Sequence, residues 1–198
     1  AELINDETVD RLGIYVQDQM YITDNLIVLA GLRYDSFDQS LTSTSRSRAS
    51  DTVVSETETD QFGDAVTPRI GIVYLPSDTI ALYASYAQSF TPNSGTDIEG
   101  NTLEPETGEG FEVGIKADII PDRLSATLAY FNITRQNVAT ADPNDPLLQA
   151  SIATGEQRSR GIELDISGEI LPGWNIIASY AYIHAETKIG RAPCRDRV

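Results

Sequence analysis

The side chains that most often perform chemistry are sparse in this sequence. Its 198 residues include one histidine, His184, and one cysteine, Cys194. A hydrolase needs a nucleophile with a nearby base, and a zinc site needs several Cys or His ligands. Neither set can be assembled, because no Ser or Asp stands at a persuasive spacing from His184. The sequence therefore predicts no catalytic residues, no metal ligands and no bound cofactor.

The chemistry that the chain does offer lies in its carboxylates. Asp and Glu number 30 against 14 Lys and Arg, which gives a net charge of −16. Nucleic acid needs a basic surface, so we expect no nucleic-acid partner. The densest run, from Asp97 to Glu109, holds five acidic and no basic residues. This run is either a solvated loop surface or a surface that binds other anions through divalent cations.

Two glutamates, Glu112 and Glu163, stand in segments where polar and apolar residues alternate. Across residues 161–170 every second residue is Ile, Leu or Gly, and the residues between them are Gly, Glu, Asp or Ser. Residues 111–119 alternate in the same way. A period of two is typical of a β-strand with one apolar face. The alternation places both glutamates on the polar faces of their strands.

The same pattern recurs along the chain and predicts about eight strands in four antiparallel hairpins. Short turns at 23–25, 76–78, 121–123 and 171–173 join the hairpins on one side, and longer polar loops follow Leu41, Phe90 and Asn137 on the other. The pattern leaves the facing of Phe131 and Ile133 open. The expected strands are residues 11–22, 26–35, 67–75, 80–86, 111–119, 124–137, 161–170 and 174–186.

Strand length separates a membrane protein from a soluble one. A two-sheet soluble protein could bury the same apolar faces, but its strands average about 5 to 6 residues. Strands of about 12 residues, at ~3.3 Å per residue and a tilt near 40°, reach roughly 30 Å, which covers an apolar band of about 25 Å. No apolar run approaches the ~20 residues of a membrane helix. We therefore expect an all-β, antiparallel transmembrane β-barrel segment.

The motifs of the chain resemble the TonB-dependent outer-membrane receptors for ferric siderophores, most closely the ferrichrome and hydroxamate-type branch. The likeness covers about residues 10–187. The order and spacing of the motifs match, as well as their content. They are T-P-R-I-G at 67–71, S-F-T-P-N at 89–93, L-E-P-E-T-G at 103–108, F-E-V-G-I-K at 111–116, A-T-G-E-Q-R-S-R-G-I-E-L-D at 153–165, and residues 174–186.

The resemblance implies a receptor that takes up ferric siderophores across the outer membrane of a Gram-negative bacterium. Such a receptor is a 22-stranded barrel closed by an amino-terminal plug domain and energised through TonB. Residues 1–188 would form an open arc of that barrel, with the plug and the TonB-contacting segment outside this chain. The implied partners are the ferric siderophore, the plug, the TonB complex, the lipid bilayer and lipopolysaccharide.

The resemblance also implies roles for individual residues. In the family, two barrel glutamates pair with plug arginines, and their motifs match F-E-V-G and R-G-I-E around Glu112 and Glu163. These two residues are therefore expected to contact the plug, unless they are ordinary water-facing carboxylates. Phe90, Asn93 and Tyr130 lie near the outer mouth. They are either ligand-binding residues of a vestibule or girdle and loop-packing residues.

Two other functions remain as alternatives. A passive porin-like channel would share the strand pattern but would not need plug-pairing glutamates at these positions. An outer-membrane enzyme would need a nucleophile and a base, which the sequence does not offer.

The last ten residues break the alternation. Residues 189–198 read I-G-R-A-P-C-R-D-R-V, with three arginines where a loop should begin. We interpret this tail as non-native sequence that resembles translated adapter read-through. Re-amplification of the locus from source DNA would recover the same codons only if the tail is native.

Overall fold

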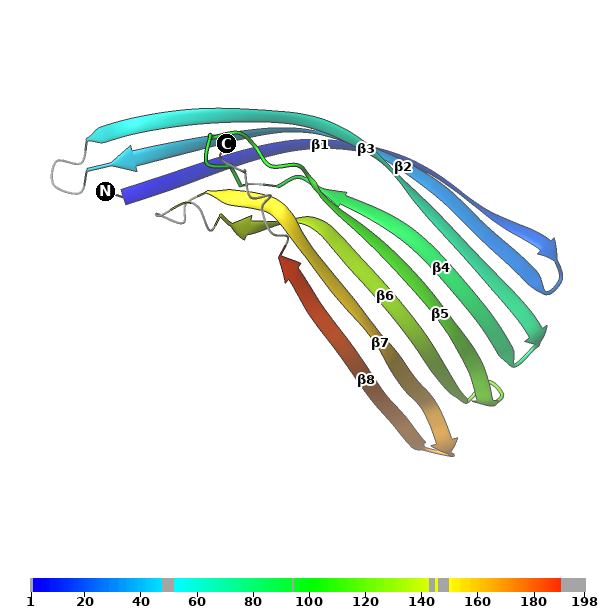
Figure 1. The fold of residues 1–198 in the computed structure, drawn as a ribbon. Helices are drawn as coiled ribbons and strands as arrows, with labels where there is room; N and C mark the ends of the chain where they lie inside the picture. The colour runs from blue at the N-terminus through cyan, green and yellow to red at the C-terminus, as the bar shows by residue number, and fades with distance from the viewer. Residues whose placement is uncertain (1, 48–51, 94, 143–144, 146–149, 190–198) are drawn as a thin grey trace, which may run out of the picture.

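The chain forms one curved antiparallel sheet in a computed structural model that describes residues 2–47, 52–93, 95–142, 145 and 150–189. Its eight strands lie side by side in sequence order, and the sheet curves into an open arc (Figure 1). This confirms the predicted all-β arc of four hairpins. Among the described residues, no helix is long and apolar enough to cross a membrane. Most of the tail, residues 190–198, lies outside the described residues.

The strands vary from 12 residues in β4 to 25 in β3. They are β1 (Glu2–Thr23), β2 (Leu26–Arg46), β3 (Val53–Ser77), β4 (Ile80–Thr91), β5 (Glu106–Ile120), β6 (Leu124–Ala141), β7 (Ser151–Leu171) and β8 (Trp174–Ile189).

The first of the expected long loops is mostly strand, so that prediction is wrong. β2 and β3 stay paired from Leu41–Thr59 up to Arg46–Val53, with one register shift after Ser45, which leaves only six residues between the strands. Ser and Thr make up residues 42–45, and threonine favours the extended backbone. The ladder therefore continues beyond the region of apolar alternation. The other two loops, residues 92–105 and 142–150, do separate their strands.

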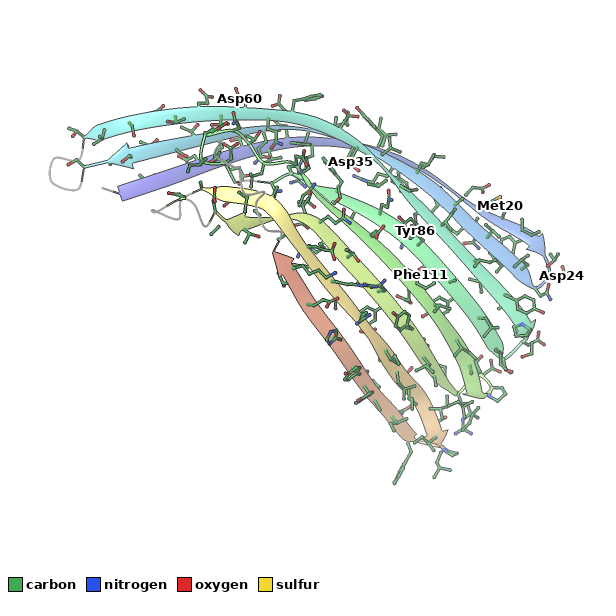
Figure 2. All side chains as sticks on the ribbon, in the orientation of Figure 1. Met20, Asp24, Asp35, Asp60, Tyr86 and Phe111 are labelled. Atoms are coloured by element: carbon green, nitrogen blue, oxygen red, sulfur yellow. The ribbon has the colours of Figure 1, made fainter. Side chains whose placement is uncertain are left out.

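The short turns lie together at the other end of the sheet, as predicted. Figure 2 shows Asp24 at this end and Asp60 far away on the extension of β3. The second turn is formed by Asp78 and Thr79 rather than by residues 76–78, because Ser77 still pairs with Ile80. In the last turn Gly173 has φ +79°, a left-handed conformation that glycine adopts without steric cost.

Strand register sorts the side chains onto two faces. The outward face carries apolar rows such as Leu82, Ile115 and Leu128, which are opposite one another on β4, β5 and β6. The lumenal face carries Glu112 and, opposite it on β6, Phe131. Ile133 shares the parity of Phe131, so both side chains whose facing the sequence left open are lumenal.

Large apolar side chains on the outward face remain exposed in this single-layer sheet. Leu82 and Leu128 are 40% and 45% exposed, and Tyr180 on β8 is 64% exposed. A sheet one layer thick has no core of its own, so water would meet this face at a high free-energy cost. Lipid covers such a face in a membrane barrel, whose backbone groups are satisfied within the sheet.

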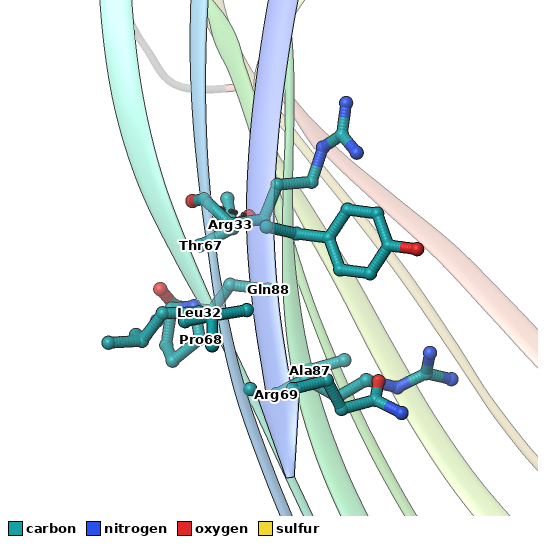
Figure 3. Close-up of a pocket in the computed structure, with 11 residues that line it drawn as sticks. Leu32, Arg33, Thr67, Pro68, Arg69, Ala87 and Gln88 are labelled. Carbon is teal, nitrogen blue, oxygen red and sulfur yellow. Dashed lines mark hydrogen bonds between the residues drawn. The ribbon is translucent and has the colours of Figure 1, made fainter.

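The sheet splits between β3 and β4, because the two strands stop pairing before their long-loop ends. Their register ends at Arg69–Ala87, and the next residue of β3 is Pro68, which has no N–H to continue a ladder. Pairing of β3 with β2 continues past this point. A hollow opens between the diverging strands, with Arg33, Thr67, Pro68 and Gln88 in its lining (Figure 3).

Three lumenal aromatic rings lie over glycines of the neighbouring strand. In each case the ring and the glycine are register partners, and an added Cβ on the glycine would meet the ring at 2.5 to 3.0 Å. The rings therefore lie along the wall instead of projecting into the lumen. The pairs are Phe37 over Gly63, Tyr83 over Gly114, and Phe131 over Gly161.

We predict that Gly114→Ala destabilises the barrel by about 1 to 3 kcal/mol, because the new methyl group must displace the Tyr83 ring. Gly110→Ala is the matched control on the same strand and face, since its nearest non-neighbouring atom, on Ile133, is 3.8 Å from the new Cβ. Urea unfolding of a complete receptor carrying this segment would measure both. Equal midpoints for the two variants would contradict the close contact.

Candidate lumenal site and outer vestibule

Glu112 is held in place by a tyrosine of the preceding strand. The Tyr83 hydroxyl donates a hydrogen bond of 2.7 Å to Glu112 Oε1. The Tyr83 ring can reach across β5 because its register partner is Gly114, which has no side chain to block it. The bond fixes one carboxylate oxygen and leaves the other available to a second partner.

Glu163 lies near Glu112 on the other side of β6. Glu112 is opposite Phe131 and Glu163 is opposite Ala129, two positions along the same strand and on the same face. Among the described residues, Glu163 forms no side-chain hydrogen bond or ion pair. Two half-buried carboxylates therefore flank β6 without a cation beside them, an arrangement that favours binding of a positively charged group.

Two other lumenal carboxylates, Asp165 and Asp35, already have partners within the sheet. Ser179 donates a hydrogen bond of 2.6 Å to Asp165, and the Arg33 guanidinium contacts Asp35 at 2.7 Å. These contacts distinguish Glu163, which has no such partner, from its neighbour Asp165 on the same strand. Glu163 therefore keeps its acceptor capacity unused, and so does the second carboxylate oxygen of Glu112.

The loop of residues 92–105 is anchored by Asn93. This side chain is 8% exposed, and its amide nitrogen donates to the backbone carbonyls of Glu104 and Asn137. Asn137 donates in return to the carbonyl of Pro105 at 3.1 Å. The geometry gives Asn93 a loop-packing role at the start of the loop.

The same loop reaches both halves of the sheet. Gln39 on β2 donates to the carbonyl of Asn93 at 3.3 Å, and Gln61 on β3 donates to that of Leu103 at 3.0 Å. On the other side, the Ser151 amide donates to the Thr96 carbonyl at 2.8 Å. The loop therefore spans the lumenal side from β2 and β3 to the start of β7.

Part of the acidic run forms a defined turn within this loop. Asp97 Oδ1 accepts hydrogen bonds from the backbone amides of Glu99 and Asn101, and Asp97 Oδ2 accepts one from the Asn101 side chain. These donors, the Asn101 side chain first, lower the pKa of Asp97 below its usual value. Asp97 thus orders the loop.

Phe90 and Tyr130 occupy different environments. The Phe90 ring packs against Phe37, with centroids 5.5 Å apart, near the outer mouth. Tyr130 shares its register row with Val113 and Ile162 on the outward face, 40% exposed. Its ring therefore belongs with the outward aromatic residues. Ligand contact by Phe90, Asn93 and Tyr130 stays a prediction that no observation here tests.

Sequence reasoning missed Tyr83, Gln39 and Gln61. Tyr83 could have been found by aligning the two strands, since the register that pairs it with Gly114 also places it beside Glu112. The glutamines carry no local signal, because their role depends on a loop more than thirty residues away. No cluster of three or more potential metal ligands occurs in the part of the chain that the structure describes.

Long antiparallel strands with an apolar outward face and a charged lumenal face define a wall segment of an outer-membrane barrel. The chain matches the family model described as TonB dependent receptor-like, beta-barrel, over residues 2–194. The chain belongs to this TonB-dependent receptor family. Its members are outer-membrane proteins of Gram-negative bacteria, which gives the location of the chain.

Individual relatives agree with this assignment. The chain is 39% identical over 182 residues to the metal-pseudopaline receptor CntO of Pseudomonas aeruginosa, covering 92% of this chain and 25% of that receptor. It is 35% identical over 178 residues to the ferrichrome outer membrane transporter/phage receptor of Escherichia coli, covering 89% and 22%. A receptor named for metal-pseudopaline and one named for ferrichrome thus match at similar identity.

A solved structure also matches. The siderophore receptor PiuA from Acinetobacter baumannii superposes with a TM-score of 0.80 at 28% identity, covering 97% of this chain and 28% of that one. The chain spans about a quarter of the length of the curated relatives named above. These relatives support a receptor and not the porin alternative.

We predict that Asn93→Ala loosens the vestibule loop, because the Glu104 and Asn137 carbonyls lose their donor at a cost of about 1 to 3 kcal/mol. Hydrogen exchange at the Leu103 amide, measured in a complete receptor carrying this segment, should accelerate. Asn101→Ala is the control, since it removes a contact within the Asp97 turn and leaves the loop anchor intact. Weaker siderophore binding with unchanged exchange would instead identify Asn93 as a ligand contact.

Proposed function

We propose that this chain is part of the barrel of a receptor that takes up ferric siderophores and is energised through TonB. The observation that carries the proposal is the family match across residues 2–194. Relatives named as receptors for ferric pyoverdine and for siderophores support the class of cargo. A hydroxamate siderophore remains the expected type, because a net charge of −16 disfavours a highly anionic catecholate complex.

We further propose that Glu112 and Glu163 hold the plug domain. Both are half-buried on the lumenal face, and Tyr83 orients Glu112 by its 2.7 Å hydrogen bond. A buried carboxylate against a packed plug needs a cation, and arginine supplies paired donors that match a carboxylate. A catalytic role is not part of the proposal, since the single histidine of the chain lies on the outward face, opposite Arg160.

Iron uptake separates the receptor from a passive channel. Cells that lack their own siderophore receptors and express a complete receptor carrying this segment should accumulate radiolabelled iron from a ferric hydroxamate siderophore. Uptake should stop when TonB is deleted or the proton-motive force is dissipated. Uptake that continues without either would support the porin-like alternative and contradict the proposal.

Charge removal tests the plug contact. Glu112→Gln combined with Glu163→Gln should lower the stability of plug docking by about 1.5 to 3 kcal/mol for each charged hydrogen bond lost. The measurement is the thermal transition of the plug in the complete receptor, together with the entry of a large antibiotic into cells. Asp64→Asn with Glu109→Gln makes the same charge change on the outward face. A plug transition that moves equally in both double variants would refute the contact.

A further inference from the structure

One edge of β3 has no neighbouring strand over its long-loop half. The pairing of β3 with β4 ends at Arg69–Ala87, whereas its pairing with β2 continues up to Val53. Figure 1 shows β3 continuing beyond the point where β4 diverges from it. Within the described part of the chain, no other backbone hydrogen bond reaches residues 53–67. We define the free edge as the stretch of β3 from Glu56 to Val66.

The register determines which backbone groups line the free edge. In an antiparallel pair, alternate residues direct both N–H and C=O to the same neighbouring strand. The Leu75 amide donates to the Asn25 carbonyl at 2.8 Å, so the odd-numbered residues of β3 bond to β2. This register is unbroken from Leu26–Tyr74 to Ser45–Ser55. The groups directed to the free edge therefore belong to the even-numbered residues Glu56, Glu58, Asp60, Phe62, Asp64 and Val66.

The same even-numbered residues carry the outward side chains, and most of these are carboxylates. Asp64 is ten residues from Tyr74 near the short turn, which places it about 25 Å up at ~3.3 Å per residue and a tilt near 40°. The free edge therefore extends from the upper limit of the apolar band into water, and Figure 2 shows Asp60 on this stretch. Residues 53–68 contain no Lys or Arg. Within the described residues, no ion pair involves Glu56, Glu58, Asp60 or Asp64.

The lumenal side of the free edge offers less room. The odd-numbered residues include Gly63 and Ala65, and the side chain of Gln61 donates to the Leu103 carbonyl of the loop at 3.0 Å. At the foot of the free edge, a hollow of about 270 Å³ separates β3 from β4, with Val66 and Glu109 in its lining. A strand added beside β3 could therefore carry long side chains outward and short ones toward the loop.

We propose that the free edge of β3 binds an extended segment of a cationic protein or peptide as an additional β-strand. Backbone hydrogen bonds to the even-numbered residues would supply affinity. Lys or Arg at every second position would lie opposite the outward carboxylates, and opposite charges in facing positions stabilise a strand pair. Short residues between them would face the loop. Because the free edge lies outside the lumen, this site is separate from the proposed siderophore transport.

The charges favour this occupant over the two simpler ones. Pairing with the free edge of a second copy would bring acidic side chains of one copy close to those of the other, and like charges in facing positions destabilise a sheet. A metal ion would neutralise the carboxylates but would leave the backbone N–H groups of the free edge without an acceptor from a partner strand. A cationic strand satisfies the backbone groups and the side chains together.

The first test uses a complete receptor carrying this segment, purified in detergent. The probe is a fluorescent peptide of alternating Lys and Ser, long enough to span Glu56 to Val66. Backbone N-methylation of its lysines removes the amides that face β3 and keeps the charge. This should weaken binding at least 30-fold, since several hydrogen bonds, each contributing roughly a factor of five, are lost together. N-methylation of the serines instead, whose amides face away from β3, should leave the affinity unchanged.

The second test changes the receptor. Glu58→Gln with Asp60→Asn should weaken binding of the unmethylated probe about fivefold, because exposed ion pairs contribute modestly. Asp6→Asn with Asp10→Asn is the charge-matched control on the outward face of β1, two strands away, and should bind the probe with unchanged affinity. Phe62→Pro removes one amide of the free edge without touching the bonds to β2, and it should weaken binding about fivefold.

Three results would overturn the proposal. They are equal affinity for the two N-methylated peptides, an equal loss in both double variants, and a receptor that dimerises without the probe and becomes monomeric in Phe62→Pro. The peptide comparison uses the unaltered receptor, so it decides the question even if a variant does not fold. Siderophore binding on the same preparations should stay unchanged in Glu58→Gln with Asp60→Asn, which separates failure of the free-edge site from failure of the receptor assignment.

Discussion

The structure depends on the requirement that every backbone polar group inside a membrane be hydrogen-bonded within the protein. Eight strands paired in sequence order meet this requirement except where β3 and β4 diverge beyond Arg69–Ala87, and β1 and β8 are each paired on one side only. Because pairing fixes the register, each side chain faces either lipid or lumen with a period of two. In a strand that keeps this period over more than ten residues, the alternation alone therefore determines which side chains face lipid and which face the lumen.

The lumenal face follows from the same register. Tyr83 can orient Glu112 only because a glycine at 114 leaves room for its ring, and Phe131 is accommodated by Gly161 in the same way. The rings fill the space above the glycines and lie along the lumenal face of the sheet, whereas the carboxylates project from it. A domain seated inside such a wall would meet a few fixed charges on an otherwise even surface, which favours one docking position over many.

Much of this fold could be predicted from the alternation of apolar and polar residues, since in segments 161–170 and 111–119 it assigns each side chain to one face of the strand. The length of the strands could not be predicted in this way. The Ser and Thr residues at 42–45 are equally compatible with a strand and a loop, and only their pairing with β3 makes them part of β2. The candidate glutamates came from alternation and family resemblance. Tyr83 and Asn93 acquired their roles from partners on other strands, and a single sequence carries no direct signal for such contacts.

The segment from Arg158 to Glu163 shows how one strand serves two environments. Its arginines at 158 and 160 are on the outward face, whereas Gly161 and Glu163 are on the lumenal face, so alternate residues of one motif meet lipid and lumen. A substitution here changes one environment only. An insertion of one residue would exchange the faces for the rest of the strand, placing the carboxylate in lipid and the apolar residues in water. The role of such a motif therefore depends on its register as well as on its residue types.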